Sequence, residues 1–234
     1  MTKSEVKLIN TPESLKKIIY TAYRTCYSPD GAGKIWDTSV SPDKMLNLIL
    51  KFGDIHDSPL EHIQFTFTID SISRAATHQL VRHRHMSFSQ KSQRYITEKG
   101  QFDYIVPGSI ENSFLLNPGE YEGLMCDIQR LYTQMISMGI PAEDARYVLP
   151  NAATSSMTVS LNLRAMINLC NLRLCTRAQK EIRDVVKMMR NLVVEKEPWL
   201  NEFLQPKCVK DGGCTEIKSC GFNEPREKKE MRMM

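Results

Sequence analysis

The stretch IQFTFTIDSISRAATHQLV, residues 63–81, changes its apolar spacing halfway along. Isoleucine or phenylalanine occupies every second position from Ile63 to Ile69 and the positions between are polar, which is typical of a half-buried strand. From Ile72 to about Val81 the apolar residues follow the spacing of a helix instead. A strand that leads directly into a helix indicates a protein of mixed class.

The same spacing and capping signals predict further elements on both sides of this stretch. Ser41-Pro42 and Asn117-Pro118 are typical helix starts, because Ser and Asn cap the first turn and proline suits its first position. We expect helices from Thr11, from Ser41 to Gly53, from Asn117 to Gly139, from Pro141 to Leu149 and from Ala178 to Glu197, a strand within Tyr95–Val106, and a turn-rich loop at Ser28–Lys34. Helices and strands in this irregular order predict an α+β fold.

Length and composition suit one folded domain with a short appendage. The chain has 234 residues, of which 41% are hydrophobic and 25% charged, and a formal net charge of +4. We expect a domain over residues 1–206 and a polar tail over residues 207–234 that carries Cys208, Cys214 and Cys220. A net charge of this size is too small to demand a polyanionic partner by itself.

The first residues and the cysteines indicate a cytoplasmic protein. The opening MTKSEVKLIN lacks the apolar centre of a secretory signal. No run reaches the ~18 apolar residues that a membrane-spanning helix needs, so we expect no membrane contact. The seven cysteines are an odd number in a chain without an export signal, and we expect them to be reduced thiols in the cytoplasm.

The segment RHRHMSFSQKSQRYI, Arg82–Ile96, concentrates cations, imidazoles and hydroxyls. No acidic residue lies between Asp70 and Glu98, and all five histidines of the chain lie between His56 and His85. Three kinds of partner could explain such a cluster: a nucleic acid, a metal ion or a small phosphorylated molecule.

The first two partners fit the pattern poorly. His83 and His85 would face different sides of a helix, and the tail cysteines are separated by five residues, an unusual ligand spacing. We therefore predict no metal site and a solvent-exposed tail with reduced thiols. Binding to a nucleic-acid strand would interleave aromatic residues with the cations, but only Phe88 and Tyr95 are near. A basic module that binds a nucleotide or RNA without catalysis, and a metal-dependent hydrolase built on the histidines, remain as alternatives.

The arginines of the segment suit a phosphate group. Arg82, Arg84 and Arg94 surround a serine-rich turn, and guanidinium forks together with hydroxyls match the oxygens of a phosphate dianion. Gln79 lies three residues before Arg82, and on the preceding helix the two would share a face. The segment therefore predicts a small phosphorylated ligand.

A second polar cluster lies in the otherwise apolar segment Met157–Leu174. Arg164 and Asn168 are four residues apart and share a helix face, and Arg173 follows them. A charge within an apolar helix is costly unless it has a partner, and an anionic ligand would be such a partner.

Together these segments resemble the flavin-dependent thymidylate synthases. Arg82–Arg84, followed by seven residues and Ser92, is similar to the RHR-x7-S signature of that family. Three further segments resemble the family: SPLEH at residues 58–62, ARYVLP at residues 145–150 and NLRAMINLCNLR at residues 162–173. The resemblance extends from about Thr11 to Leu204.

The resemblance implies an enzyme that makes thymidylate. Members of the family methylate dUMP to dTMP with 5,10-methylenetetrahydrofolate as carbon donor and reduced FAD as hydride donor, and NADPH reduces the flavin. They are homotetramers whose active sites are shared between subunits, and their fold is a single α+β domain with a twisted, largely antiparallel sheet flanked by helices. They use no cysteine nucleophile, and in this sequence none of Cys26, Cys126, Cys170 and Cys175 is near the Arg and Ser residues of the signature.

Motif positions also imply the residues of the site. The resemblance implies dUMP contacts by Gln79, Leu80, Val81, Arg82, Gln90, Lys91, Ser92, Gln93, Arg94, Arg146 and Arg173. It implies FAD contacts by His56, Ser58, Arg82, His83, Arg84, Gln90, Asn162, Leu163, Arg164 and Asn168. Arg146 would reach the nucleotide of a neighbouring subunit. Arg173 would lie at the uracil ring and act as the catalytic residue, because a fixed cation there favours the anionic ring and a more nucleophilic C5.

Three positions need comment beside the resemblance. Gln90 stands where many relatives have Glu, and an amide keeps the hydrogen bonds but not the charge. Arg177 stands where many relatives carry a histidine that contacts the flavin, and an arginine could bind the FAD phosphates instead. His56 resembles a histidine that stacks near the flavin and the folate and could relay a proton, or it is only a loop residue before a strand.

Overall fold

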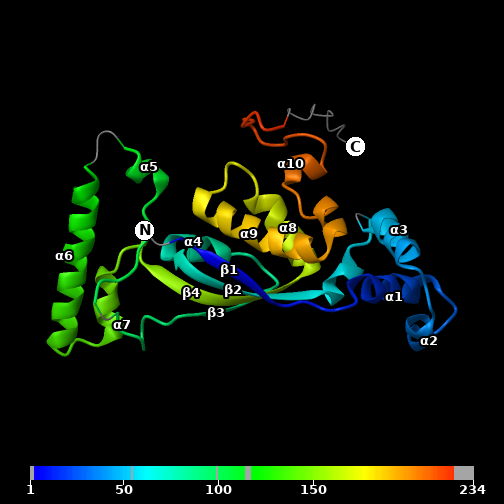
Figure 1. Cartoon of the computed structure of the whole chain (residues 1–234), viewed down its shortest axis with the longest axis horizontal. Coiled ribbons are helices and arrows are strands. Elements are labelled where there is room, and N and C mark those ends of the chain that lie inside the picture. Colours follow the sequence, from blue (N-terminus) through cyan, green and yellow to red (C-terminus); the bar gives the residue numbers. More distant parts are fainter. Residues whose placement is uncertain (1–2, 54, 99, 114–116, 224–234) are drawn as a thin grey trace, which may run out of the picture. The chain divides into compact units, whose positions relative to one another are not determined.

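The computed structural model describes residues 3–53, 55–98, 100–113 and 117–223, which form four strands and a larger number of helices (Figure 1). The strands are β1 Glu5–Asn10, β2 Gln64–Ser73, β3 Met86–Gln90 and β4 Thr154–Asn162. The helices are α1 Leu15–Tyr27, α2 Ala32–Asp37, α3 Pro42–Phe52, α4 Arg74–Leu80, α5 Gly108–Glu111, α6 Pro118–Ser137, α7 Ala142–Ala145, α8 Leu163–Arg173, α9 Lys180–Lys196 and α10 Lys207–Lys210. Three short 3₁₀ turns are η1 Ser58–His62, η2 Arg146–Val148 and η3 Pro198–Glu202.

The four strands form one open antiparallel sheet in the order β1-β2-β4-β3. β2 buries alternate residues such as Phe65, Phe67 and Ile69, and β4 does the same with Met157 and Val159. This alternation puts one apolar face of each strand toward the core, as the sequence spacing requires. The predicted α+β class with a largely antiparallel sheet in a single domain is confirmed.

Contacts within the domain group the chain into two compact units. Unit 1 comprises Met1–Lys7, Thr68–Arg82 and Phe88–Val159, and unit 2 comprises Leu8–Phe67, His83–Ser87 and Ser160–Met234. Every strand contributes residues to both units.

Unit 2 holds most of the buried helix faces. α8 and α9 lie side by side, and α9 buries a stripe of aliphatic side chains at helical spacing. α1 packs against α2, α3 and η1, where Tyr20, Ile35 and Met45 form a small apolar cluster. α3 begins at the predicted place because the Ser41 hydroxyl accepts a hydrogen bond from the backbone of Lys44.

Unit 1 is organised around the long helix α6. Its apolar stripe packs on a cluster of Phe102, Met125 and Ala153, and Asn117 caps its first turn as predicted. An isolated β-bridge pairs Tyr104, in the segment before α5, with Ala153, the residue before β4.

Several predicted boundaries were wrong. The strand expected within Tyr95–Val106 is reduced to the bridge at Tyr104, whereas Met86–Gln90, expected to be a loop, pairs with β4 as an edge strand. Met86, Phe88 and Gln90 are only half-buried, so the alternation in the sequence is weak. α1 begins at Leu15 rather than Thr11, and the expected loop Ser28–Lys34 already contains the first turn of α2.

The described part of the tail packs against α8 within unit 2. Residues 207–223 contain the short helix α10; Cys214 is buried with 8% of its surface exposed, whereas Cys208 is half-buried and Cys220 is exposed. Residues 224–234 of the expected tail lie outside the described residues. Within the described part of the chain, none of the helices has the length and apolar character needed to cross a membrane.

Gly53 at the end of α3 is a position where a side chain does not fit. A Cβ atom there would lie 2.6 Å from Cε1 of the buried Phe203 and 2.8 Å from the carbonyl oxygen of Ile49. We expect Gly53→Ala to lower the free energy of unfolding by about 1–3 kcal/mol, measured by urea denaturation. In Gly33→Ala, the matched control in α2, the new Cβ meets no atom within 4 Å; this variant should be neutral or stabilising by up to about 1 kcal/mol. Equal losses in the two variants would contradict the packing assignment.

Candidate functional site

The signature arginines lie in a turn rather than on a helix. The Ser73 hydroxyl caps α4 by accepting a hydrogen bond from Ala76, and the helix ends at Leu80. Arg82 therefore lies in the turn beyond the helix, and the expected shared helix face with Gln79 is not formed. His85 has a φ of 61°, in the left-handed region, where the chain turns into β3.

A hydrogen bond within unit 2 joins the signature to Arg173. The Nε–H of Arg173 donates to Nε2 of His83 over 2.9 Å, and only 9% of the surface of His83 is exposed. Burial first, and the nearby Arg173 charge second, lower the pKa of His83 to about 4. The imidazole is thus neutral near pH 7, accepts at Nε2 and carries its hydrogen at Nδ1.

Arg173 is the last residue of α8, and burial lowers the pKa of its guanidinium. α8 begins directly after β4 because the side chain of Asn162 accepts a hydrogen bond from Ala165 over 2.8 Å. Leu163, the next residue, is fully buried and its backbone N–H donates to Ile63, so its side chain packs in the core.

Arg164 differs from the expectation of a cation buried in an apolar helix. About half of its side chain is exposed, and its Nε lies 2.8 Å from Asp57 while Nη1 donates to Glu61. These carboxylates offset its charge, and because the side chain is exposed, the premise of a cation buried in an apolar helix does not hold for Arg164. Asn168 follows one turn later on α8 and is exposed.

His56 belongs to a small exposed aromatic group. Its ring centroid lies 6.3 Å from that of Phe52 and 6.3 Å from that of Tyr27. The hydroxyl of Tyr23 donates to the backbone carbonyl of His56 over 2.6 Å, which fixes the loop. Ser58 begins η1 two residues later and is exposed. The sequence reasoning did not include the two neighbouring rings in the site.

A cavity of about 360 Å³ in unit 1 gathers cations. It is lined by Arg74, His78, Gln93 and Arg146 together with Tyr147, Leu149, Pro150 and Asn151. Burial, and then the charge of Arg146, lower the pKa of Arg74, so the two cations lie close enough to repel one another. Arg74 and His78 were missed, although they lie four residues apart on the helix before the signature.

The serine-rich segment after β3 is held by local contacts within unit 1. Nε2 of Gln90 donates to the Thr77 hydroxyl over 3.3 Å, and the backbone N–H of Arg94 donates to the Ser92 hydroxyl over 3.2 Å. The exposed guanidinium of Arg94 pairs with Glu143 at 2.9 Å. The backbone carbonyl of the same glutamate accepts from Nε of Arg146.

The remaining predicted nucleotide residues occupy different environments. Lys91 pairs with Glu98 at 2.8 Å, Val81 is exposed and Leu80 is fully buried. The side chain of Leu80 is therefore part of the core, and only its backbone is left to face a ligand.

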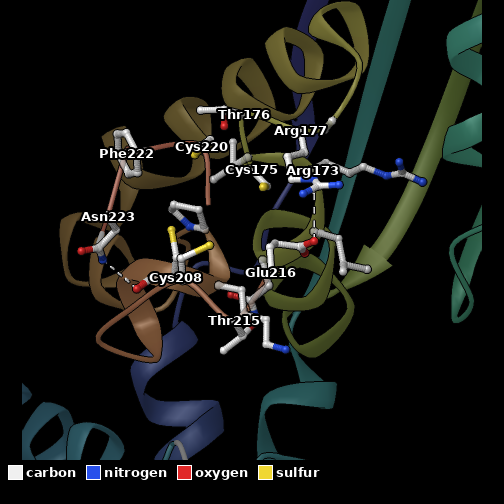
Figure 2. Close-up of a pocket in the computed structure, with 17 residues that line it drawn as sticks. Arg173, Cys175, Thr176, Arg177, Cys208, Thr215, Glu216, Cys220, Phe222 and Asn223 are labelled. Carbon is white, nitrogen blue, oxygen red and sulfur yellow. Dashed lines mark hydrogen bonds and ion pairs between the residues drawn. The ribbon is translucent and has the colours of Figure 1, made fainter. Parts of the chain in front are cut away.

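The two predicted residue sets separate between the units. Every predicted dUMP residue except Arg173 lies in unit 1, and every predicted FAD residue except Arg82 and Gln90 lies in unit 2. Cys175 lines a cavity of unit 2 together with Arg173, which lies outside the signature (Figure 2).

Comparison with known proteins identifies relatives over almost the whole chain. A family model described as thymidylate synthase complementing protein matches residues 7–199. The flavin-dependent thymidylate synthase of Clostridium tetani is 36% identical over 93% of this chain and 93% of its own. The enzyme of the same name from Geobacter sulfurreducens is 40% identical over 89% of each chain.

Solved structures share the fold. Thymidylate Synthase X (ThyX) from Helicobacter pylori, crystallised with FAD and dUMP, superposes with a TM-score of 0.67 at 26% identity, over 86% of this chain and 99% of its own. A UMP/dUMP methylase, PolB from Streptomyces cacaoi, gives the same TM-score at 21% identity, which supports the fold alone. Together with the family model and the full-length relatives, these matches show that the chain belongs to the family of flavin-dependent thymidylate synthases.

Proposed function

We propose that this protein converts dUMP to dTMP, with 5,10-methylenetetrahydrofolate as carbon donor, reduced FAD as hydride donor and NADPH as the reductant of the flavin. Its relatives carry the name of this activity, and the Helicobacter pylori protein was crystallised with FAD and dUMP. The observation that carries the proposal is the hydrogen bond between His83 of the signature and Arg173. This hydrogen bond fixes the orientation of Arg173, the cation to which we assign catalysis.

The cation-lined cavity of unit 1 supports binding of the dUMP phosphate. Arg74 and Arg146 are close enough for the charge of Arg146 to lower the pKa of Arg74. A phosphate dianion between them would remove this repulsion and accept hydrogen bonds from both forks. Gln93, which lines the same cavity, offers a neutral amide to the remaining oxygens. The predicted residues Arg82, Ser92 and Arg94 complete the proposed nucleotide set.

The polar groups of unit 2 suit FAD. His56 with its neighbouring rings Tyr27 and Phe52 offers flat surfaces for stacking, and these rings are partly or largely exposed. Arg84 and Asn168 are exposed and provide a charge and an amide for phosphate or ring oxygens. Reduced FAD bound there supplies the hydride that completes the methyl group.

Arg173 is the residue to which we assign catalysis. A guanidinium beside the uracil ring favours the form of the ring that carries negative charge, and so raises the electron density at C5. Burial of Arg173 strengthens this interaction because the local dielectric is lower than in water. His83 contributes as a positioning residue, since its neutral imidazole accepts from Arg173 without adding a second positive charge.

Assembly and location belong to the proposal as well. We propose a homotetramer in which Arg146 contributes to a neighbouring subunit's nucleotide site, as the family resemblance implies. All seven cysteines are free in the structure, which is consistent with a reducing compartment such as the cytoplasm. A basic nucleotide- or RNA-binding module remains the alternative. Binding to RNA would weaken steeply with salt and depend on strand length.

The first prediction tests the activity itself. Purified protein reconstituted with FAD should convert dUMP to dTMP when methylenetetrahydrofolate and NADPH are both present. Chromatography of the nucleotides measures the conversion. Omission of either co-substrate should leave dUMP unchanged. NADPH consumption without dTMP formation, or tighter binding of long RNA than of dUMP at physiological salt, would contradict the proposal.

The second prediction separates catalysis from cofactor binding. Arg173→Ala should lower the rate of dTMP formation by about 100-fold or more, because it removes the positive charge that stabilises the transition state. The flavin absorbance of the variant should equal that of the wild type. Arg130→Ala, which removes an exposed arginine of α6, is the matched control and should keep wild-type rates. Activity of Arg173→Ala close to that of the control would refute the assigned role.

The third prediction uses the lowered pKa of His83. The unfolded chain takes up a proton at this histidine near pH 6.5 but the folded protein only near pH 4, so unfolding is favoured as the pH falls through that window. His83→Gln keeps an acceptor for Arg173 but does not titrate. Its urea midpoint should therefore fall less than that of the wild type between about pH 7 and about pH 5. His78→Gln, an exposed control, should behave like the wild type; equal pH dependence of all three proteins would contradict the assignment.

A further inference from the structure

A second cavity, in unit 2, gathers cysteines rather than cations. It has a volume of about 240 Å³ and lies between the end of α8 and the chain that follows Pro206 (Figure 2). Four cysteines line it: Cys175, Cys208, Cys214 and Cys220. We call them the pocket cysteines. The other three cysteines of the chain line none of this cavity.

The pocket cysteines are close enough to affect one another. Burial is the main cause of the raised pKa of Cys208, and Cys175 and Cys214 lie close enough to contribute to it. The Thr176 hydroxyl lowers the pKa of Cys220 through a hydrogen bond. In Figure 2 the side chains of Cys175, Cys208 and Cys220 surround the same hollow from two separate segments of the chain.

The tail has few other means of holding its shape. Among residues 207–223, only Gly213 and Cys214 are buried, whereas Val209, Ile217 and Phe222 have 42%, 104% and 63% of their surface exposed. A segment of this size without an apolar core needs a disulfide, a metal ion or a packed partner to stay folded. All of the cysteines are free, so no disulfide is present.

Arg177 belongs to the same arrangement. Its Nη1 donates to the carbonyl oxygen of Lys218 over 3.0 Å, and its Nε lies 3.7 Å from Glu216. Asn223 closes the segment by donating to the carbonyl of Cys208 over 2.8 Å. These bonds bring the tail to the end of α8, close to Cys175, but each of them is exposed or only partly buried and contributes little alone.

We propose that the four pocket cysteines bind one soft divalent cation, with zinc as the expected ion, and that this ion fastens residues 207–223 to the end of α8. Thiolates select soft ions, and four of them satisfy the tetrahedral preference of structural zinc. Among the described residues, no three His, Cys, Asp or Glu side chains are arranged to hold an ion as they stand. Binding therefore requires that the thiols turn toward one another, and this couples the ion to the ordering of the tail.

The spacing of the ligands explains why the sequence did not reveal this site. The three tail cysteines alone are one ligand short, and five residues separate each from the next. Cys175 supplies the fourth thiol from a distance of 33 residues, immediately after α8.

Metal analysis of the reduced, full-length protein tests the proposal. Protein prepared with zinc should contain about one zinc ion per chain after gel filtration. The variants Cys175→Ser and Cys208→Ser/Cys220→Ser should contain about none, and Cys126→Ser, an exposed cysteine of α6, should keep the wild-type content. Cobalt added to metal-free protein should give the visible bands of a tetrahedral thiolate complex in the wild type and the control only.

A second measurement remains informative if a variant folds poorly. With zinc, trypsin should cut wild-type protein after Lys210 and Lys218 at least tenfold more slowly than after removal of the ion with a chelator, since metal binding orders the tail. Three results would each overturn the proposal. The purified protein could contain no zinc while all four pocket thiols react, the pocket cysteines could form disulfides with one another, or both variants could keep the wild-type zinc content. All of these readouts are independent of dTMP formation, so their failure is distinct from failure of the proposed function.

Discussion

The pairing of β2 with β4 is the constraint on which the arrangement of the site depends. The two strands are neighbours in the sheet, and within unit 2 the hydroxyls of Thr66 and Ser160 lie 3.0 Å apart across them. Each strand leads directly into a helix that its last polar residue caps, Ser73 for α4 and Asn162 for α8. The chain thus contains two similar strand–helix pairs, β2 with α4 and β4 with α8. The signature follows the first helix, and Arg173 ends the second.

Much of this could be predicted from the sequence, because strong periodicity and capping determine local structure. β2, α3, α4, α6 and α9 were found close to their predicted places. The edge strand β3 was missed because serines fill its outward positions and its inward side chains are only half-buried. A strand was placed instead where exposed Tyr95 and Ile96 only resemble one.

The residues of the site were predictable as a set, but their contacts were not. The resemblance named His83 and Arg173 separately, and only the fold brings them within 2.9 Å across 90 residues of sequence. The partners of Arg164 could not be predicted either, because Asp57 and Glu61 lie in a turn more than 100 residues earlier. Arg74 could have been noticed, since it lies on the helix that leads into the signature. Tertiary packing decides which polar side chains pair over long range, and local propensity does not predict it.

Glu143 contacts two of the predicted nucleotide residues. Its carboxylate pairs with Arg94 at 2.9 Å, and its backbone carbonyl accepts from Arg146. In the proposed function, a phosphate that binds the fork of Arg94 displaces this carboxylate, so binding would exchange one anion for another at Arg94. An exposed pair of this kind contributes only about 0–1 kcal/mol, so the exchange is inexpensive. Under the proposed function, Glu143 therefore competes with the nucleotide phosphate for Arg94.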